Sequence, residues 1–538
     1  MSVSITWDEL VQYSVDAYNL IEPYSENYNS PIYDYKTNSE KWCQPEYITL
    51  VFLYLVSGDP TYLDLAKSAL EYACNNLVNA NNVMLTYDKS SHSPSTDMTV
   101  RVYALALYLQ ASVYIAKLDS AYVSYAKKIG DVILEHQQGT GLFAHRLNPD
   151  GTVAISDEGD GTAQNSRYVI PPLIWLYELT NDTTYLNAVK DCLDALYGYE
   201  DSNHLVPNRI DSVSGSINDS TTRCSQQQMY VYHNLLYYLA SGNETYNTRY
   251  QNALQGLYDV FWKGSYWMYR SNNNIIEHSG AWLDNNFYAN DDYVSETDID
   301  FDKRYIQLCP LTDEYIQLHA VYPDCTLYSK PPIHFKQLYI STCCHEHYRR
   351  HQNETAWETG VQTFKALQYM KKSYGYVYGI DPYTHEPWTE WNPWFWSCVE
   401  PRWGFMLAFC AMPLLIKLNG VKIDWGIPFN CPVIMGHGLA IHYDIMKNQF
   451  SLKDKYIKLS LTGTGSVTFE TGYDIDHVYK NGSEYTNFSG KTLTVDGDGV
   501  YEVYFGAEVT PPPVEGYVGT FGKCWGFRRY SLSKGVWE

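Results

Sequence analysis

Hydrophobic positions in the first 418 residues alternate between two kinds of predicted helix. Five segments follow a short polar turn, begin at an aromatic residue, and place small or apolar residues about four, seven and eleven positions later. This is the stripe of an amphipathic helix, which packs on one side only, so these helices are predicted to lie outside. The aromatic residues are Tyr62, Tyr122, Tyr185, Tyr246 and Trp357.

More uniformly apolar segments alternate with these helices, and a helix apolar on most sides is buried. Clear examples are 47–56, 102–116, 169–179 and 229–240. Adding an outer helix at about 7–20 and an inner one at about 394–418 gives six of each kind. Inner helices should begin near 43, 97, 164, 224, 334 and 394, and outer ones near 7, 61, 119, 183, 245 and 354. The predicted fold is mainly α, an (α/α)6 toroid, although an open solenoid has the same periodicity.

The connections differ in length according to their direction. Turns from inner to outer helices hold about two to four residues, whereas the connections back to the next inner helix are long. On a toroid all the long connections emerge on one face. Long loops on a rigid scaffold commonly carry function, so we expect a cleft on that face, at the N-terminal ends of the inner helices.

The pattern changes after residue 420. Short alternating segments at 456–461, 466–470, 492–495 and 500–505, separated by glycine-rich and Asn-Gly turns, predict a small antiparallel β-sandwich. Three prolines at 511–513 then lead into an aromatic, basic tail. The predicted domains are a toroid at 1–420 with a long insertion at about 263–333, a linker and sandwich at 421–508, and a tail at 509–538.

Composition narrows the range of partners. The 538 residues carry a formal net charge of −23, which repels nucleic acids and anionic membranes, so neither is an expected partner. No apolar run reaches the roughly 20 residues that span a bilayer, and the first residues do not resemble a secretory signal. The 52 Tyr and 15 Trp residues offer rings that suit stacking on sugars. We expect a carbohydrate ligand and an extracellular, cell-surface or virion location; the oligomeric state is not predicted.

Helix pairs, one-sided long connections, abundant rings and an appended β-domain together resemble the (α/α)6-toroid carbohydrate-active enzymes. That group includes glycoside hydrolases, unsaturated glucuronyl hydrolases and polysaccharide lyases. The resemblance covers about residues 7–418, where turns such as Gly58-Asp59-Pro60-Thr61-Tyr62 are similar to theirs. It implies an enzyme that processes carbohydrate; no cofactor is predicted.

Acidic residues in the long connections are the catalytic candidates. Glycoside hydrolysis needs one carboxylic acid to protonate the leaving oxygen and a second carboxylate as base or nucleophile. Asp97, at the expected start of an inner helix, and Asp160, in a glycine-flanked acidic loop, are the leading pair, with Asp381 and Glu390 in reserve. Helix capping for Asp97 and a solvated turn for Asp160 are the alternatives.

Rings and arginines in the same connections are the substrate-binding candidates. Arginine binds carboxylates or sulfates through two hydrogen bonds, so the arginines favour an anionic sugar such as a uronate, with salt bridges to loop acids as the alternative. Arg101 joins this group at an inner-helix start. The candidates are Trp42, Tyr87, His145, Arg146, Arg167, Tyr168, Arg209, Arg223, His334, Trp388, Trp391 and Trp394.

Three functions remain open from the sequence. The first is a glycoside hydrolase acting on an oligo- or polysaccharide, including uronate-containing ones. The second is a polysaccharide lyase, in which Asn165, Arg167, Tyr168 and His334 would neutralise the uronate and move its proton. The third is a non-catalytic glycan-binding or structural protein. No metal site is predicted, because the Cys- and His-rich segment at 343–351 lacks a further ligand at a defined spacing.

Overall fold

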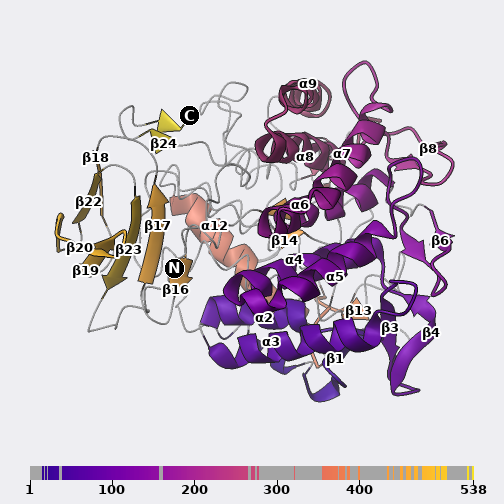
Figure 1. Cartoon of the computed structure of the whole chain (residues 1–538), viewed down its shortest axis with the longest axis horizontal. Coiled ribbons are helices and arrows are strands. Elements are labelled where there is room, and N and C mark those ends of the chain that lie inside the picture. Colours follow the sequence, from indigo (N-terminus) through magenta and orange to yellow (C-terminus); the bar gives the residue numbers. More distant parts are fainter. Residues whose placement is uncertain are drawn as a thin grey trace.

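The computed structural model shows packed helices with the C-terminal antiparallel sheets to one side of them (Figure 1). The residues that the structure describes fall into separate ranges. These are 12, 15–16, 18–20, 22–34, 39–57, 59–156, 162–263, 268, 270–272, 276–277, 320–321, 354–373, 375–377, 379–381, 384–387, 398–399, 433–434, 440–441, 449–451, 456–461, 466–470, 475–490, 492–496, 499–505, 530–531 and 536–537.

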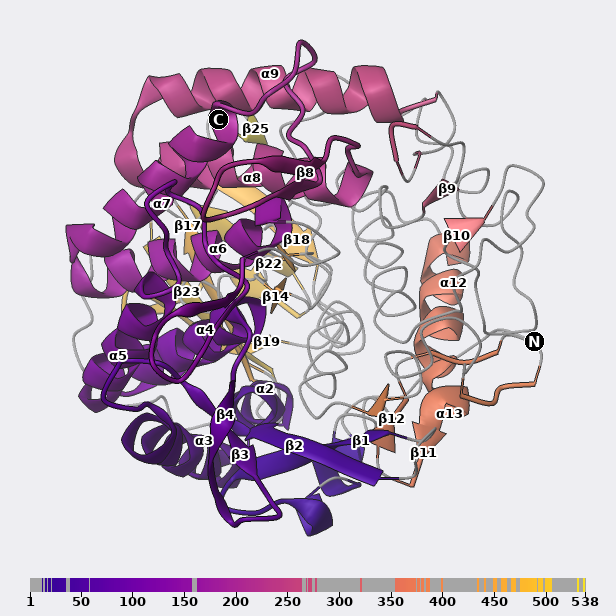
Figure 2. The same ribbon diagram turned by 90° about the vertical axis from the view of Figure 1, so that its right-hand side faces the viewer.

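Four successive helix pairs confirm the predicted alternation. Figure 2 shows the inner helices along an arc, each with its outer partner on the outer side of the arc, and α12 (Glu354–Lys365) and α13 (Leu367–Met370) across the ring from them. No helix in the described ranges is long and apolar enough to cross a membrane. The inner helices are α2 (Tyr47–Ser57), α4 (Val102–Leu118), α6 (Thr162–Thr180) and α8 (Cys224–Ser241), and the outer ones are α3 (Pro60–Tyr72), α5 (Val123–Leu134), α7 (Thr183–Tyr197) and α9 (Glu244–Phe261).

Acidic and amide side chains start the outer helices. Asp59, Asp119, Asp182 and Asn243 each accept a hydrogen bond from the backbone N–H two residues later, which satisfies a donor that the first helical turn leaves open. Short helical turns accompany the pairs: η1 (Glu22–Tyr24), the π-helical η2 (Ala73–Leu77) after α3, and η3 (Ser120–Tyr122) before α5.

For α5, α7 and α9, the aromatic residue three positions after the cap ties the helix to the preceding outer helix. The hydroxyl of Tyr122 donates to Glu71 at 2.6 Å, that of Tyr185 to Asp131 at 2.7 Å, and that of Tyr246 to Asp194 at 2.7 Å. Burial, followed by the hydrogen bond to Asp131, raises the pKa of Tyr185, so its hydroxyl remains a donor at neutral pH. The aromatic repeat seen in the sequence therefore corresponds to a repeated tyrosine–carboxylate hydrogen bond between successive outer helices.

Replacing Tyr185 by phenylalanine is expected to lower the free energy of unfolding by about 1.5 kcal/mol, because a hydrogen bond to a charged acceptor is lost at a nearly fully buried site. Urea unfolding would measure the change. Tyr197→Phe is the matched control, since the Tyr197 side chain is 44% exposed. Equal losses in the two variants would contradict the role of the tie.

A β-hairpin precedes each of the four described inner helices. The structure thus corrects two predicted helix starts: strands occupy 39–45 and 93–99, so α2 begins at Tyr47 rather than near 43, and α4 at Val102 rather than near 97. Figure 1 shows the later hairpins at the end of the ring opposite the C-terminal sheets, which we call the hairpin face. The hairpins are β1 (Asn29–Asp34) with β2 (Ser39–Pro45), β3 (Leu85–Asp88) with β4 (Ser93–Thr99), β5 (Arg146–Leu147) with β6 (Val153–Ile155), and β7 (Arg209–Ile210) with β8 (Ile217–Asp219).

Two contacts join the beginning of the chain to the far end of the helical region. Strand β13 (Cys398–Val399) pairs with β1, extending the first two hairpins into a sheet of order β13-β1-β2-β3-β4. Lys371 forms an ion pair of 2.6 Å with Asp16. These contacts favour a closed ring over an open solenoid. Residues 398–399 are strand, which corrects the helix predicted from 394; the inner helix expected near 334 lies outside the described residues.

The C-terminal region is antiparallel β-structure, and its four predicted strands are confirmed. A five-stranded sheet has the order β16-β17-β23-β19-β20 and a three-stranded sheet the order β18-β22-β21. Their packing as a sandwich and the proposed domain boundaries stay predictions. The strands are β16 (Gln449–Ser451), β17 (Tyr456–Leu461), β18 (Ser466–Glu470), β19 (Ile475–Lys480), β20 (Ser483–Tyr485), β21 (Phe488–Ser489), β22 (Thr492–Asp496) and β23 (Gly499–Phe505).

The remaining strands form isolated pairs. They are β9 (Ile276–Glu277) with β10 (Ala320–Val321), β11 (Lys371–Lys372) with β12 (Gly375–Tyr376), β14 (Val433–Ile434) with β15 (Ala440–Ile441), and β24 (Tyr530–Ser531) with β25 (Val536–Trp537).

Candidate functional site

Arginine stands at the N-terminal ends of two inner helices, α4 and α8. Arg101 and Arg223 occupy the N-cap positions, and neither side chain makes a capping hydrogen bond. Ser, Thr, Asp and Asn are the usual residues there, because their oxygens accept from the first helical N–H groups. Both guanidinium groups are thus held at a helix start without serving as its cap.

At the start of α4, Arg101 lies beside a tyrosine and a histidine. The Nη1 atom of Arg101 donates to the hydroxyl of Tyr103 at 3.0 Å, and the Tyr103 and His145 ring centroids are 5.7 Å apart. The N–H of Val102 donates to the carbonyl of His145, which fixes the start of strand β5 against the helix. The side chains of Arg101, Tyr103 and His145 therefore form a cluster at the N-terminal end of α4.

At the start of α8, three side chains form a hydrogen-bonded chain. Gln226 donates through Nε2 to Oδ1 of Asn208, and Asn208 donates through Nδ2 to Oδ2 of Asp219 at 2.7 Å. Asp219 lies directly across the hairpin from Arg209, and the backbone of Arg223 pairs with that of Arg270. Asp219 is thus opposite Arg209 on the hairpin, and Arg223 and Arg270 are neighbours along the backbone bridge at the same helix end.

Asp219 is held as a carboxylate. Burial acts to raise its pKa, but hydrogen bonds from Asn208 and Thr221 and the charge of Arg270 outweigh burial and lower it. Gln227, the residue after Gln226 in α8, holds the segment that leads into β7. Its side-chain amide accepts from the Val206 N–H at 3.1 Å and donates to the Val206 carbonyl at 2.6 Å. The strand that carries Arg209 is therefore anchored to the helix.

Two of the four predicted catalytic acids are described. Asp97 lies on β4, exposed, and accepts from the Ser95 hydroxyl at 2.7 Å, so the expected place at a helix start is wrong. Asp381 closes a turn, where one carboxylate oxygen accepts from the Thr384 N–H at 2.7 Å. Asp160 and Glu390 lie outside the described residues. The catalytic roles stay predictions.

Apart from Tyr87, the predicted binding residues divide into three groups. His145, Arg146, Arg209 and Arg223 lie at the N-terminal ends of α4 and α8 or on the adjoining hairpins, as expected. Trp42 lies on β2, and Arg167 and Tyr168 lie early in α6; the side chains of these three are outside the description. His334, Trp388, Trp391 and Trp394 are outside it altogether.

Tyr87 has a different position from the one predicted. Its ring is fully buried, contacts Tyr72 of the outer helix α3, and its hydroxyl donates to Glu26 at 2.8 Å. These partners hold the β3–β4 hairpin against the outside of the ring. The geometry argues against Tyr87 as a substrate contact, because neither its ring nor its hydroxyl is open to a ligand.

Sequence reasoning missed several residues of these helix ends. They are Tyr103, Asn208, Asp219, Gln226 and Arg270. One signal was available: His145-Arg146-Leu147 and Asn208-Arg209-Ile210 are similar tripeptides in successive repeats, each with a half-buried arginine between two buried residues. Among described residues, no group of three His, Cys, Asp or Glu side chains could hold a metal ion.

The start of α2 contains a buried acid, Glu46. It is 4% exposed and accepts from the Ser30 hydroxyl at 2.5 Å. Burial raises the pKa of Glu46, with hydrogen bonds from Ser25 and Ser30 acting in the opposite direction. A folded-state pKa above the unfolded value means that this group costs stability as pH rises above the unfolded pKa.

Replacing Glu46 by glutamine is therefore expected to raise the melting temperature at pH 8 and to leave it unchanged at pH 3, where the unfolded carboxyl is also protonated. Thermal unfolding at both pH values tests this. Glu26→Gln should instead lower the melting temperature at pH 8, because hydrogen bonds from Tyr87 and His92 lower the pKa of Glu26 and so stabilise its charged form in the folded protein. A destabilised Glu46→Gln at pH 8 would show that the charged form is needed.

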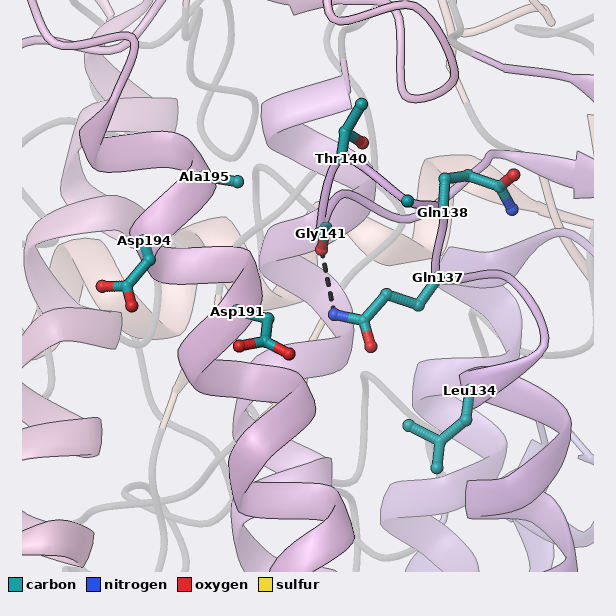
Figure 3. Close-up of a pocket in the computed structure, with 9 residues that line it drawn as sticks. Leu134, Gln137, Gln138, Thr140, Gly141, Asp191, Asp194 and Ala195 are labelled. Atoms are coloured by element: carbon teal, nitrogen blue, oxygen red, sulfur yellow. Dashed lines mark hydrogen bonds between the residues drawn. The ribbon is translucent and has the colours of Figure 1, made fainter.

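A groove of about 680 Å³ lies between the C-terminal end of α5 and helix α7. Figure 3 shows its walls, the turn Gln137–Gly141 and the side chains of Asp191 and Asp194. Gln137 closes the turn by donating to the Gly141 carbonyl at 3.0 Å. None of its lining residues belongs to the arginine-bearing helix ends, so this groove of the outer helices is not the predicted cleft.

Comparison with known proteins gives structural likeness only. No family model and no curated protein matches the chain. Solved structures similar to it include a cellobiose 2-epimerase from Bacillus thermoamylovorans B4167, at 11% identity and TM-score 0.46, covering 75% of this chain and 98% of that one. An unsaturated glucuronyl hydrolase from Bacillus sp. GL1 is similar at 10% identity and TM-score 0.43, covering 76% and 97%. A D-mannose isomerase is similar at 11% identity and TM-score 0.46, covering 76% and 96%.

These neighbours belong to the (α/α)6-toroid carbohydrate-active enzymes that the sequence resembles, and they do not resolve a family within that group. They differ among themselves in reaction.

Proposed function

We propose that this chain is a carbohydrate-active enzyme that binds an anionic saccharide on its hairpin face and hydrolyses a glycosidic bond there. The observation that carries the proposal is the placement of arginines at the starts of α4 and α8 and on the adjoining hairpins. Arg101 and Arg223 occupy equivalent N-cap positions, and Arg146 and Arg209 equivalent hairpin positions. Repeated guanidinium groups at one end of a ring suit repeated carboxylates or sulfates along a sugar chain.

Hydrolysis in this site would use two carboxyl groups. One must hold a proton for the leaving oxygen, and the other must act as a base toward water or as a nucleophile. Asp97, exposed on the hairpin before α4, and Asp160, just before α6, remain the proposed pair. The arginines would hold the sugar so that its glycosidic oxygen faces these acids, since positioning supplies much of the rate of such reactions.

A lyase is the second candidate, and the cluster at α4 favours it. β-Elimination needs a cation on the uronate carboxyl group and a base that removes the adjacent proton. Arg101 is hydrogen-bonded to the Tyr103 hydroxyl, and His145 lies beside the same ring. Arg101 and Tyr103 have the chemistry that an elimination requires, without a carboxylate pair, and the fully buried His145 would act only by holding the Tyr103 ring.

A panel of neutral and uronate-containing polysaccharides separates these functions. New reducing ends without ultraviolet absorbance would support hydrolysis, and both signals together would support elimination. A changed sugar of unchanged chain length would indicate an epimerase or isomerase, and no change in any substrate would favour a binding protein. If hydrolysis is found, Asp97→Asn and Asp160→Asn should each abolish it; retention of turnover in both would overturn the acid pair.

A further inference from the structure

Asn208 is a buried junction between helix α8 and the hairpin that precedes it. Its side chain is 0% exposed, and both ends of its amide are used: the oxygen accepts from Gln226 in the first turn of α8, and the nitrogen donates to Asp219 on β8. Gln226 is itself only 2% exposed. An amide can bridge a donor and an acceptor in this way, whereas an apolar residue of the same size would leave the buried Gln226 and the half-buried Asp219 without these bonds.

Asp219 is the last acceptor in the chain of hydrogen bonds that runs from Gln226 through Asn208. Its second oxygen accepts from the N–H of Thr221 at 3.0 Å and from the Thr221 hydroxyl at 2.8 Å, so the carboxylate is held from both sides. Arg209 lies across the hairpin from it, and the charge of Arg270 acts on it. The orientation of this carboxylate therefore affects the electrostatic surroundings of both arginines.

We propose that Asn208 is a positioning residue for anionic-sugar binding: through Asp219 it sets the arrangement of Arg209 and Arg270 at the start of α8. This inference rests on the proposed function, because it assigns the binding of an anionic sugar to that end of the ring. Asn208 itself does not touch the sugar. Its effect is transmitted by a fixed carboxylate, and a small displacement of that carboxylate changes the affinity of the site.

The substitution Asn208→Asp gives a specific test. The aspartate keeps an oxygen that accepts from Gln226. Its other oxygen replaces the Asn208 Nδ2 atom, which lies 2.7 Å from Oδ2 of Asp219, so a second carboxylate faces Asp219. At neutral pH both carboxylates are ionised and repel each other at this distance; at lower pH they share one proton, which restores a hydrogen bond between them. A structural defect would not be repaired by acid in this way.

Binding of oligogalacturonate would be measured by calorimetry at pH 7.5 and pH 5, with the full chain. For Asn208→Asp we expect the dissociation constant to rise about 30-fold at pH 7.5 and to return to within about threefold of wild type at pH 5. The exchanged pair, Asn208→Asp with Asp219→Asn, restores one donor and one acceptor and should bind within about threefold of wild type at both pH values.

Asn79→Asp is the matched control. The Asn79 amide also ties a turn, by donating to the Pro149 carbonyl at 2.7 Å, but it faces no carboxylate in that bond. It should leave binding unchanged. Weakened binding by Asn208→Asp that acid and the exchanged pair both fail to restore would overturn the positioning role, as would wild-type affinity at pH 7.5. If the wild-type protein binds no oligogalacturonate or sulfated oligosaccharide, the proposed function itself is wrong.

Discussion

Replacing Arg223 by lysine is expected to lower kcat/KM on a uronate-containing substrate about 100-fold. The Arg223 residue is 8% exposed at the start of α8, where its backbone is fixed against Arg270. Lysine keeps the charge but presents a single ammonium group instead of the planar fork that binds a carboxylate through two hydrogen bonds. A loss of this size corresponds to about 2.7 kcal/mol of transition-state binding.

Steady-state kinetics on the active substrate from the panel would measure the loss, with a melting curve to confirm that the variant folds. Arg249→Lys is the control: Arg249 forms an ion pair of 2.7 Å with Asp194 between the outer helices α7 and α9, away from the starts of the inner helices. It should keep wild-type kcat/KM. Full activity of a folded Arg223→Lys protein would remove Arg223 from the binding site.

Acid is expected to destabilise the protein through His136, with a loss of about 3 kcal/mol between pH 6.5 and pH 4 from this residue. His136 is completely buried at the end of α5, and its Nδ1 atom lies 3.0 Å from the Ala144 carbonyl. Burial, with a smaller contribution from His145, lowers the pKa of His136 from 6.5 to about 4. Below pH 6.5 the unfolded chain therefore binds a proton that the folded protein does not, and stability falls as pH falls.

Urea unfolding at pH 7, 5.5 and 4 tests this dependence in wild type and in His136→Asn, whose amide can still donate to the Ala144 carbonyl. The variant should lose less stability than wild type over that interval, by about 3 kcal/mol. His92→Asn is the control, because the His92 side chain is 73% exposed. Parallel pH profiles for wild type and His136→Asn would show that another group causes the acid sensitivity.

The helix pairs could be predicted because each depends on a local signal. The spacing after Tyr62, Tyr122, Tyr185 and Tyr246 marks a one-sided helix, and the polar turns before them contain the caps that the structure shows. The four C-terminal strands were also predictable, because each has five to seven residues, enough to show the two-residue alternation of apolar and polar positions between turn signals.

The hairpins could not be predicted in the same way. Strands of two or three residues, such as β5 to β8, are too short to show a period of two, and their partners are chosen by the helix against which they pack. Strand β13 illustrates the same limit, because its partner β1 is more than 350 residues away in the sequence. Asp97 was predicted at a helix start although it lies on β4, a seven-residue strand whose sequence does not alternate between apolar and polar residues.

The sequence by itself determined the number and order of the described helix pairs, the end of the ring that carries the long connections, and the choice of arginines as candidate ligands for an anion. Those conclusions follow from periodicity, loop length and side-chain chemistry, all of which are local. Only the tertiary structure decided that β13 pairs with β1, that Tyr87 packs against the outer helix α3, and that Asn208 joins Gln226 to Asp219. Each of these depends on contacts between residues distant in sequence or on the direction of a single side chain, and neither is encoded in a local pattern.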